Sequence, residues 1–525
     1  MLDSLADFVI SWPSWLGMVF FGLTGLLFAV NMAVVFTGPD GASFQREWRR
    51  HMLPAGAVAV FAALVRGIWS PHYFTVIGQD IWALNDSIKV YPFANFTIAR
   101  SPAHALLLRL YTELAGFSIP SIFFLNAALG AVFCVLVYAL AFLYCGEIFC
   151  SLCAAFVAAL LPSSVIGSGG VNDFAVSAVC VAVFFICLRM FSLRKTPEWF
   201  AAASCALALA AQSRFDNPLL CVVYFLALRW LWTELPEGTK KTEVVCQNIA
   251  YAALMLPYAI YSLVFYHRYF GSAPGPGFFR MLVLNLHMLR DGGALSSVLF
   301  WVCAVGVFTA LRCARIKIPA LRPVWIFGLV FLAIYITHEG FEPWYPMAAG
   351  SLVWTALFAG ANALLEHNAA RRTVLSCATA VIGVVFAFQL HIYANDLGEK
   401  AKCFVTHVIE AEQTAVPPGS AIVFAELGAG SPNNILPQFI SAEYFRYSPG
   451  ASTEPLARLL AGGKKAYYLP QLSFEDISSS RDNPEDIRIE NSKVFVMRPS
   501  AEFSFPDDHG MAHFYHVYQI TGVGR

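Results

Sequence analysis

The sequence has 525 residues, of which 58% are hydrophobic and only 13% are charged. Soluble domains are about 45 to 50% apolar and about 25% charged, so the composition excludes an ordinary soluble enzyme. It also excludes a disordered chain, because disorder requires low hydrophobicity and high net charge. The 34 basic and 34 acidic residues cancel. No global basic field is therefore present to attract nucleic acid, and nucleic acid is not an expected partner.

Long apolar segments dominate the first three quarters of the chain. A transmembrane helix needs about 20 mostly apolar residues. The pattern predicts an all-α polytopic membrane bundle of about twelve transmembrane helices over residues 1–395, followed by a soluble α/β domain over residues 396–525. The expected spans lie near residues 12–37, 52–69, 118–144, 147–167, 174–191, 198–213, 217–233, 245–267, 294–312, 320–337, 344–365 and 373–393.

Basic residues in short loops predict the orientation, because they favour the cytoplasm. Five basic clusters fall on one side if every apolar run crosses once, which puts both termini and the C-terminal domain outside. The first run has no basic segment before it and no small-residue cleavage site, so it is expected to be a retained span. The clusters are Arg46, Arg49 and Arg50; Arg189, Arg194 and Lys195; Lys240 and Lys241; Arg312, Arg315, Lys317 and Arg322; and Arg371 and Arg372.

The same count leaves two long outer loops, residues 70–117 and 268–293. Within the first, the segment Ser101 to Ala115 has leucines at helical spacing, at positions 106, 107, 110 and 114. This spacing predicts an amphipathic helix that lies in the membrane interface.

After His391 the composition becomes that of a soluble module. Residues 398–413 are expected to form a helix, and a Pro-Pro-Gly turn follows at 417–419. The segments 421–425, 465–469, 493–497 and 513–520 are typical of strands. The glycines in this region do not form a nucleotide-binding pattern, and no cofactor is predicted.

Two aspartates at the outer ends of spans are candidate catalytic residues. Asp80 lies just beyond the second span, where partial desolvation can raise its basicity and let it take a proton from a hydroxyl nucleophile. The alternative is a solvated loop carboxylate, which is the interpretation preferred for Asp86. Asp173 opens the fifth span, where capping of the helix N-terminus would also explain it.

The remaining outer loops carry cations, carboxylates and aromatic residues. Arg214 and Asp216 can simply pair with each other. Arg280, His287 and Arg290 provide donors suited to a phosphate, or their side chains can reach toward lipid headgroups. The segment with His338, Glu339, Glu342, Trp344 and Tyr345 can line a sugar pocket or anchor the interface. Neither this spacing nor the Cys150 and Cys153 pair matches a metal motif, and no metal site is predicted.

Several of these features together resemble a known family. Asp80 after an early span, the segment Arg100 to Gly116 and the hydrophobic hairpin that follows look like the first half of the GT-C membrane glycosyltransferases. The likeness is greatest to the protein O-mannosyltransferase and lipid A aminoarabinose transferase branch. Asp173, Ser213 with Arg214, and Trp344 to Pro346 fall where that branch has comparable features, so the resemblance covers residues 70 to about 365. It departs from the family where Ile81 follows Asp80 in place of a glutamate, and where Trp344 with Tyr345 replaces an arginine-tyrosine pair.

The resemblance implies an inverting transfer of a sugar from a polyprenyl-phosphate donor to a hydroxyl of a glycan, lipid or protein on the outer face of a membrane, such as the bacterial inner membrane. Asp80 would be the base and Asp173 would orient donor or acceptor. His338, Glu342 and Tyr345 would line the sugar or acceptor pocket, and the C-terminal domain would sit over the mouth. Arg280, Arg290, Arg100 and Arg214 are the candidates for the donor phosphate. The rival interpretation is a multispan lipid transporter or flippase with an outer partner-binding domain; it is less favoured because the charges inside the apolar runs lie near span ends.

Overall fold

The computed structural model of the chain describes most of the protein and divides it into two compact units. The membrane unit comprises Met1–Ser70, Phe96–Leu107 and Phe124–Tyr393, and the C-terminal unit comprises Pro71–Asn95, Leu108–Phe123 and Ala394–Arg525. Within them the structure describes residues 14–38, 48–69, 102–116, 118–214, 217–231, 246, 249–260, 262, 294–316, 318–337, 347–366, 368–400, 412–425, 442–447, 452–469, 495–506 and 512–523.

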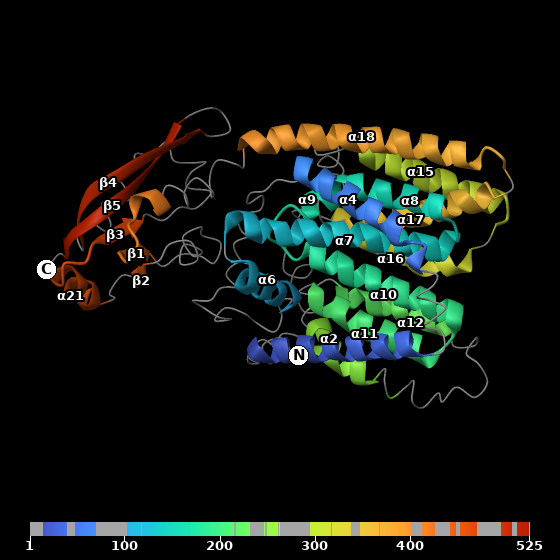
Figure 1. The fold of residues 1–525 in the computed structure, drawn as a ribbon, viewed down its shortest axis with the longest axis horizontal. Helices are drawn as coiled ribbons and strands as arrows, with labels where there is room; N and C mark the ends of the chain where they lie inside the picture. The colour runs from blue at the N-terminus through green and yellow to red at the C-terminus, as the bar shows by residue number, and fades with distance from the viewer. Residues whose placement is uncertain are drawn as a thin grey trace. The chain divides into compact units, whose positions relative to one another are not determined.

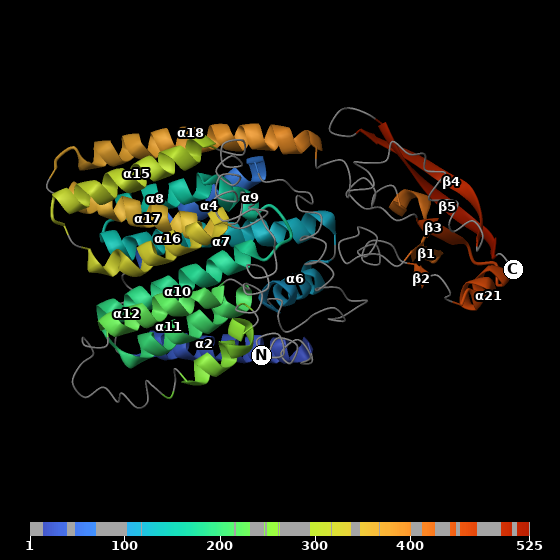
Figure 2. The same ribbon diagram turned by 180° about the vertical axis from the view of Figure 1, so that it is seen from behind.

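The membrane unit is a bundle of helices, as Figure 1 and the reverse view in Figure 2 show. Six of the described helices are long and apolar enough to cross a membrane, so a polytopic membrane fold is confirmed. Each predicted apolar run overlaps with at least one described helix, including the shorter helix at Ile249–Ile260. The others are α2 (Ser14–Thr37), α4 (Met52–Trp69), α7 (Ile119–Cys145), α8 (Ile148–Leu160), α9 (Pro162–Gly167), α10 (Phe174–Arg194), α11 (Pro197–Ser213), α12 (Leu220–Leu231), α15 (Ala294–Cys313), α16 (Arg322–Thr337), α17 (Met347–Leu364) and α18 (Arg371–Lys400).

The fourth apolar run is divided between two helices. Leu161 has φ −58° and ψ 121°, which is an extended conformation, and α9 begins at Pro162. The ring of a proline disfavours the helical conformation of the residue before it, so α8 ends at Leu160. The break starts a new direction for residues 162–173, which lead to Asp173.

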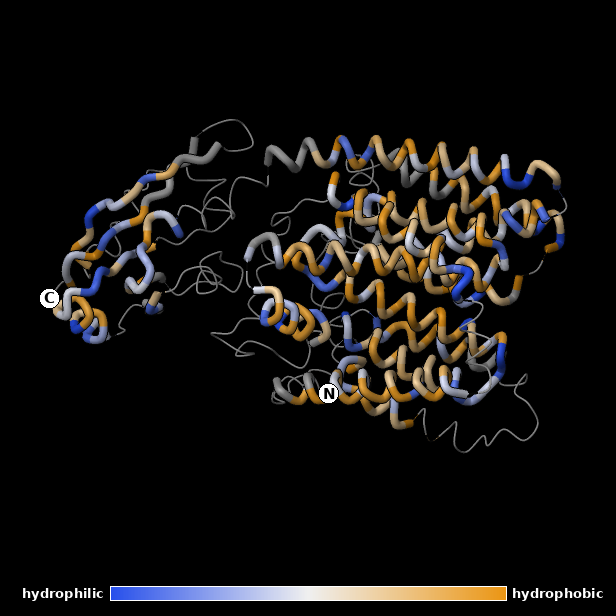
Figure 3. The backbone as a smooth tube through the Cα atoms, viewed as in Figure 1, coloured by the Kyte–Doolittle hydropathy of each residue, from blue (hydrophilic) through white to orange (hydrophobic). Residues whose placement is uncertain are grey.

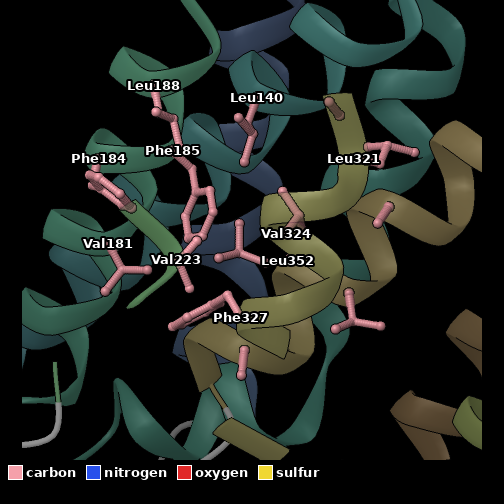
Figure 4. Close-up of a cluster of buried hydrophobic side chains, with 14 of the residues drawn as sticks. Leu140, Val181, Phe184, Phe185, Leu188, Val223, Leu321, Val324, Phe327 and Leu352 are labelled. Carbon is pink, nitrogen blue, oxygen red and sulfur yellow. The ribbon is translucent and has the colours of Figure 1, made fainter. Parts of the chain in front are cut away.

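The core of the bundle is apolar and aromatic. Figure 4 shows Phe184 and Phe185 of α10 beside Val223 of α12 and Phe327 of α16. The ring centroids of Phe185 and Phe327 are 5.2 Å apart, a separation typical of favourable aromatic pairs. Apolar residues also cover the outside of the helices, which are orange along most of their length in Figure 3. Phe308 and Val384 are among the exposed ones, and exposed apolar surface of this extent fits a lipid environment.

Four of the five basic clusters lie at one end of the bundle. The Nε of Arg189 donates to the carbonyl oxygen of Leu143 at 3.2 Å, and Arg371 forms an ion pair with Glu147 at 2.6 Å. The structure therefore joins the ends of α7, α10 and α18. Two further contacts place the clusters at 49–50 and 312–315 at the same end. His51 contacts Tyr138 of α7, and Leu311 lies beside Gly360 of α17.

Residues 102–115 form the predicted helix, α6 (Pro102–Ala115). Its sides differ as the leucine spacing indicates, because Leu110 and Leu114 are exposed whereas His104 and Leu108 are buried. The helix itself is confirmed, and its place in a membrane interface stays a prediction.

The C-terminal unit contains a five-stranded mixed sheet in the order β2-β1-β3-β5-β4. The strand β1 (Ala421–Ala425) pairs in parallel with β2 (Glu443–Tyr447) and with the central strand β3 (Ala466–Leu469), and α21 (Glu454–Ala461) precedes β3. The strands β4 (Phe495–Pro506) and β5 (Ala512–Val523) form an antiparallel pair that joins β3. Pro499 lies in β4 at the edge of the sheet, where the missing N–H is tolerated.

Four of these strands coincide with the segments predicted from sequence. The strand β2 and the helix α21 were not predicted from the sequence. For the predicted helix over 398–413, α18 extends to Lys400 and residues 412–415 are helical, while 401–411 lie outside the described residues.

Candidate functional site

Asp173 and Arg214 meet at the end of the bundle opposite the basic clusters. Asp173 immediately precedes α10, and Arg214 immediately follows α11. The Nη1 of Arg214 donates to Oδ1 of Asp173 at 2.9 Å. The Arg214 side chain is 7% exposed and that of Asp173 is 27% exposed, so the carboxylate stays accessible while the guanidinium is enclosed. The Arg214 guanidinium also lies 3.8 Å from the ring centroid of Phe174, which gives a cation–π contact.

The carboxylate of Asp173 does not cap the helix it precedes. Asp173 occupies the N-cap position but makes no capping hydrogen bond with its side chain. The side-chain oxygen of Asn172 instead accepts from the backbone N–H of Phe174 at 3.1 Å. The capping interpretation of Asp173 is therefore wrong, and its carboxylate is left to interact with Arg214. Asp216, the alternative partner of Arg214, lies outside the described residues.

Two asparagines hold the segments that present this pair. Asn126 of α7 donates through Nδ2 to the carbonyl oxygens of Gly170 at 2.6 Å and Asn172 at 2.8 Å, which fixes the turn before Asp173. The buried Asn217 donates through Nδ2 to Ala210 O, Ser213 Oγ and Ser177 Oγ. It thereby ties the end of α11 to α10. The position of the ion pair is set by buried side chains of several helices.

A buried arginine supports the other end of the same turn. Arg66, in the last turn of α4, is 1% exposed. Its Nε donates to Ser168 Oγ at 2.8 Å, and its Nη2 donates to Ser164 Oγ at 3.0 Å. Over the residues that the structure describes, no carboxylate pairs with this guanidinium. Buried charges are stable only when paired or hydrogen-bonded, and here serine and carbonyl oxygens provide the acceptors.

Close packing at Gly130 makes this arrangement possible. A methyl group at position 130 would lie 2.5 Å from the Cβ of Ser168, and closer still to the Nε of Arg66. Any larger residue at position 130 would therefore displace the arginine or the serine.

His104 of α6 faces the same site. It is 3% exposed, and burial lowers the pKa of its imidazole to about 4, although the Asp173 carboxylate and the Asn126 side chain favour the protonated form. The imidazole is therefore neutral near pH 7. Among the described residues, its buried Nε2 has no hydrogen-bond partner of good geometry, and neither has Asn126 Oδ1.

Most of the residues proposed from sequence are in segments that the structure does not describe. Asp80, Arg100, Arg280, Arg290, His338, Glu342 and Tyr345 lie outside the described residues, whereas Asp173 and Arg214 are described and in contact. His104 and Asn126 are site residues that were not predicted from the sequence. Asn126 could have been predicted from the sequence, because it is a lone polar residue in an apolar stretch. In the described part of the chain, no group of three or more His, Cys, Asp or Glu residues could hold a metal ion.

The fold is shared with solved structures of membrane proteins. ArnT from Cupriavidus metallidurans bound to undecaprenyl phosphate matches 89% of this chain and 98% of its own, with a TM-score of 0.58 and 12% identity. Its apo state matches 88% and 98%, with a TM-score of 0.54 and 13% identity. ArnT is a GT-C glycosyltransferase. This chain has the GT-C fold. No family model matches the sequence, and no curated protein is significantly similar to it.

Proposed function

We propose that this chain is a membrane glycosyltransferase that moves a sugar from a polyprenyl-phosphate donor to an acceptor hydroxyl. The observation that carries the proposal is the GT-C fold, shared over 98% of the length of an ArnT structure that contains undecaprenyl phosphate. The accessible Asp173 carboxylate supports it, because it lies in a polar site at one end of an otherwise apolar bundle. Such a bundle can flank a lipid tail while the polar end takes the headgroup.

In the proposed reaction Asp80 is the base. The acceptor oxygen attacks the anomeric carbon while the bond from that carbon to the phosphate oxygen breaks, with inversion. The acceptor proton passes to Asp80, and the leaving phosphate takes the bonding electrons. A cation stabilises the charge that develops on the phosphate. Because Arg214 is enclosed and already paired with Asp173, we assign the phosphate to Arg100, Arg280 or Arg290, and the sugar or acceptor pocket to His338, Glu342 and Tyr345.

The pair of Asp173 and Arg214 is proposed to orient a substrate. The guanidinium fixes one carboxylate oxygen at 2.9 Å, and a carboxylate has further lone pairs that can accept from sugar hydroxyls. The proposal also includes twelve transmembrane spans, an outer location for the site and for residues 396–525, the bacterial inner membrane as the location of the protein, and contact between the C-terminal domain and the acceptor.

The experiment that tests the proposal measures turnover of purified protein with undecaprenyl-phosphate-linked hexoses. Asp80→Asn keeps the size of the side chain but removes the proton acceptor, so turnover should fall about 10² to 10⁴ fold. Binding of undecaprenyl phosphate should persist. Asp86→Asn, the matched control, should cost little.

An Asp80→Asn protein with parental turnover would remove the base from the mechanism. A parental protein that moves linked hexoses across vesicle membranes without cleaving them would favour the transporter interpretation instead.

A further inference from the structure

Two buried polar atoms beside Asp173 have hydrogen-bonding capacity that the described protein does not use. These are Nε2 of His104 and Oδ1 of Asn126. Both residues are almost completely buried, and the His104 imidazole lies beside the Asn126 side chain and within reach of the negative charge of Asp173. Buried polar atoms in native proteins nearly always have a partner. Two such atoms side by side, with no hydrogen bond of good geometry between them, indicate a group that the described residues do not supply.

The orientation of Asn126 is fixed by its other contacts. Its Nδ2 donates to Gly170 O and Asn172 O, and both of these acceptors are carbonyl oxygens. A flipped amide would place its single oxygen against both carbonyl oxygens and lose both hydrogen bonds, so the amide cannot turn. The Oδ1 atom therefore presents only acceptor capacity to whatever lies beside it.

The chemistry of the three residues selects the kind of ligand. A neutral imidazole carries one donor and one acceptor, the amide oxygen accepts, and the Asp173 carboxylate accepts and is negatively charged. The Arg214 cation is already paired with that carboxylate. An anion such as phosphate would meet acceptors and a negative charge here, whereas a hydroxyl can both donate and accept.

We propose that His104, Asn126 and Asp173 form a binding site for the hydroxyl groups of a sugar, an inference that rests on the proposed glycosyltransferase function. One hydroxyl donates to Asn126 Oδ1 and accepts from or donates to the imidazole of His104. A neighbouring hydroxyl donates to the Asp173 carboxylate. The sugar can belong to the lipid-linked donor or to a glycan acceptor, because both present neighbouring hydroxyls.

Thermal stabilisation of the full-length protein in detergent tests the site. The probes are undecaprenyl phosphate, the same lipid linked to glucose, galactose or mannose, and free hexoses added after saturation with the bare lipid. The bare lipid should stabilise the parental protein, and at least one linked or free hexose should stabilise it further. A response to linked hexose identifies the donor as the source, and a response to free hexose alone identifies the acceptor.

His104→Leu should weaken the hexose-dependent step about 10- to 100-fold, because the ligand loses one buried hydrogen bond. It should leave the response to bare lipid unchanged. His104→Gln, which retains a donor and an acceptor, should recover part of the hexose response and also serves if the leucine variant fails to fold. His51→Leu is the matched control, since His51 is buried at the opposite end of the bundle and bonds to Tyr138 at 2.7 Å; it should lower the melting temperature but keep the hexose response.

Equal hexose responses in the parental, His104→Leu and His104→Gln proteins would overturn the inference and leave a bound water as the partner of these atoms. The same holds if bare lipid stabilises the parental protein and no hexose adds to it. A parental protein that responds neither to bare lipid nor to any hexose would overturn the proposed function itself, and the inference with it.

Discussion

Gly130→Ala should destabilise the membrane unit by displacing Arg66. The added methyl group would stand 2.5 Å from Ser168 Cβ and 2.6 Å from Ser168 Oγ, with Arg66 Nε closer still. These separations are well inside van der Waals contact, which for carbon atoms is about 3.5 to 4.0 Å, so the hydrogen bond of 2.8 Å between Arg66 and Ser168 cannot persist unchanged.

The magnitude follows from two contributions. A hydrogen bond that involves a charged group contributes about 1.5 to 3 kcal/mol, and overpacking of a filled interior costs about 1 to 3 kcal/mol. The two overlap, because moving the arginine relieves part of the clash. We therefore expect the clash and the lost hydrogen bond together to lower the free energy of unfolding by about 2 to 4 kcal/mol. Replacing a helical glycine by alanine offsets roughly 1 kcal/mol of this loss.

The assay is a thermal melt of purified protein in detergent, with Gly56→Ala as the control. Gly56 is also a helical glycine in the bundle, and a methyl group there would meet nothing within 4 Å, so this variant should keep or slightly raise the melting temperature. Ser168→Gly removes two of the clashing atoms, so Gly130→Ala should cost less in that background. A Gly130→Ala protein as stable as Gly56→Ala would refute the close packing around Arg66.

Two further predictions concern pH and sidedness. Burial lowers the folded-state pKa of His104 from 6.5 to about 4. The neutral imidazole therefore contributes fully to stability above pH 6.5, and this contribution, in total about 3 kcal/mol, is lost as pH falls toward 4. The melting temperature of the parental protein should fall more between pH 7 and pH 4.5 than that of His104→Leu, and equal falls would contradict the burial of the imidazole. The second prediction uses cysteine labelling in variants without other exposed cysteines. Lys195→Cys and Arg372→Cys should react with a membrane-impermeant thiol reagent from the cytoplasmic side, and Asp80→Cys should react from the outer side. Labelling of Lys195→Cys and Arg372→Cys from different sides would show that the span count is wrong.

The amino-acid sequence by itself determined the helices and most strands, because these depend on local patterns. Runs of about 20 apolar residues predict helices such as α7 and α10, and alternation with β-branched and aromatic residues predicts strands such as β1 and β5. The strand β2, with the sequence Glu-Tyr-Phe-Arg-Tyr, lacks this signal because charged residues are suited to the edge position it occupies. The break at Leu161 depends on Pro162 alone, so it could also be predicted from the sequence.

Only the tertiary structure decided which polar residues meet. Arg214 contacts Asp173 across 41 positions, and Arg66 contacts Ser168 across 102 positions. Each of these residues has an ordinary local explanation, such as capping, pairing with a near neighbour or an interfacial position at a span end. The choice among these explanations depends on how the helices pack, since desolvation makes a charge inside the bundle stable only where other elements bring acceptors to it. For the same reason the local pattern of α6 gave no indication that His104 is buried beside Asp173 and Asn126.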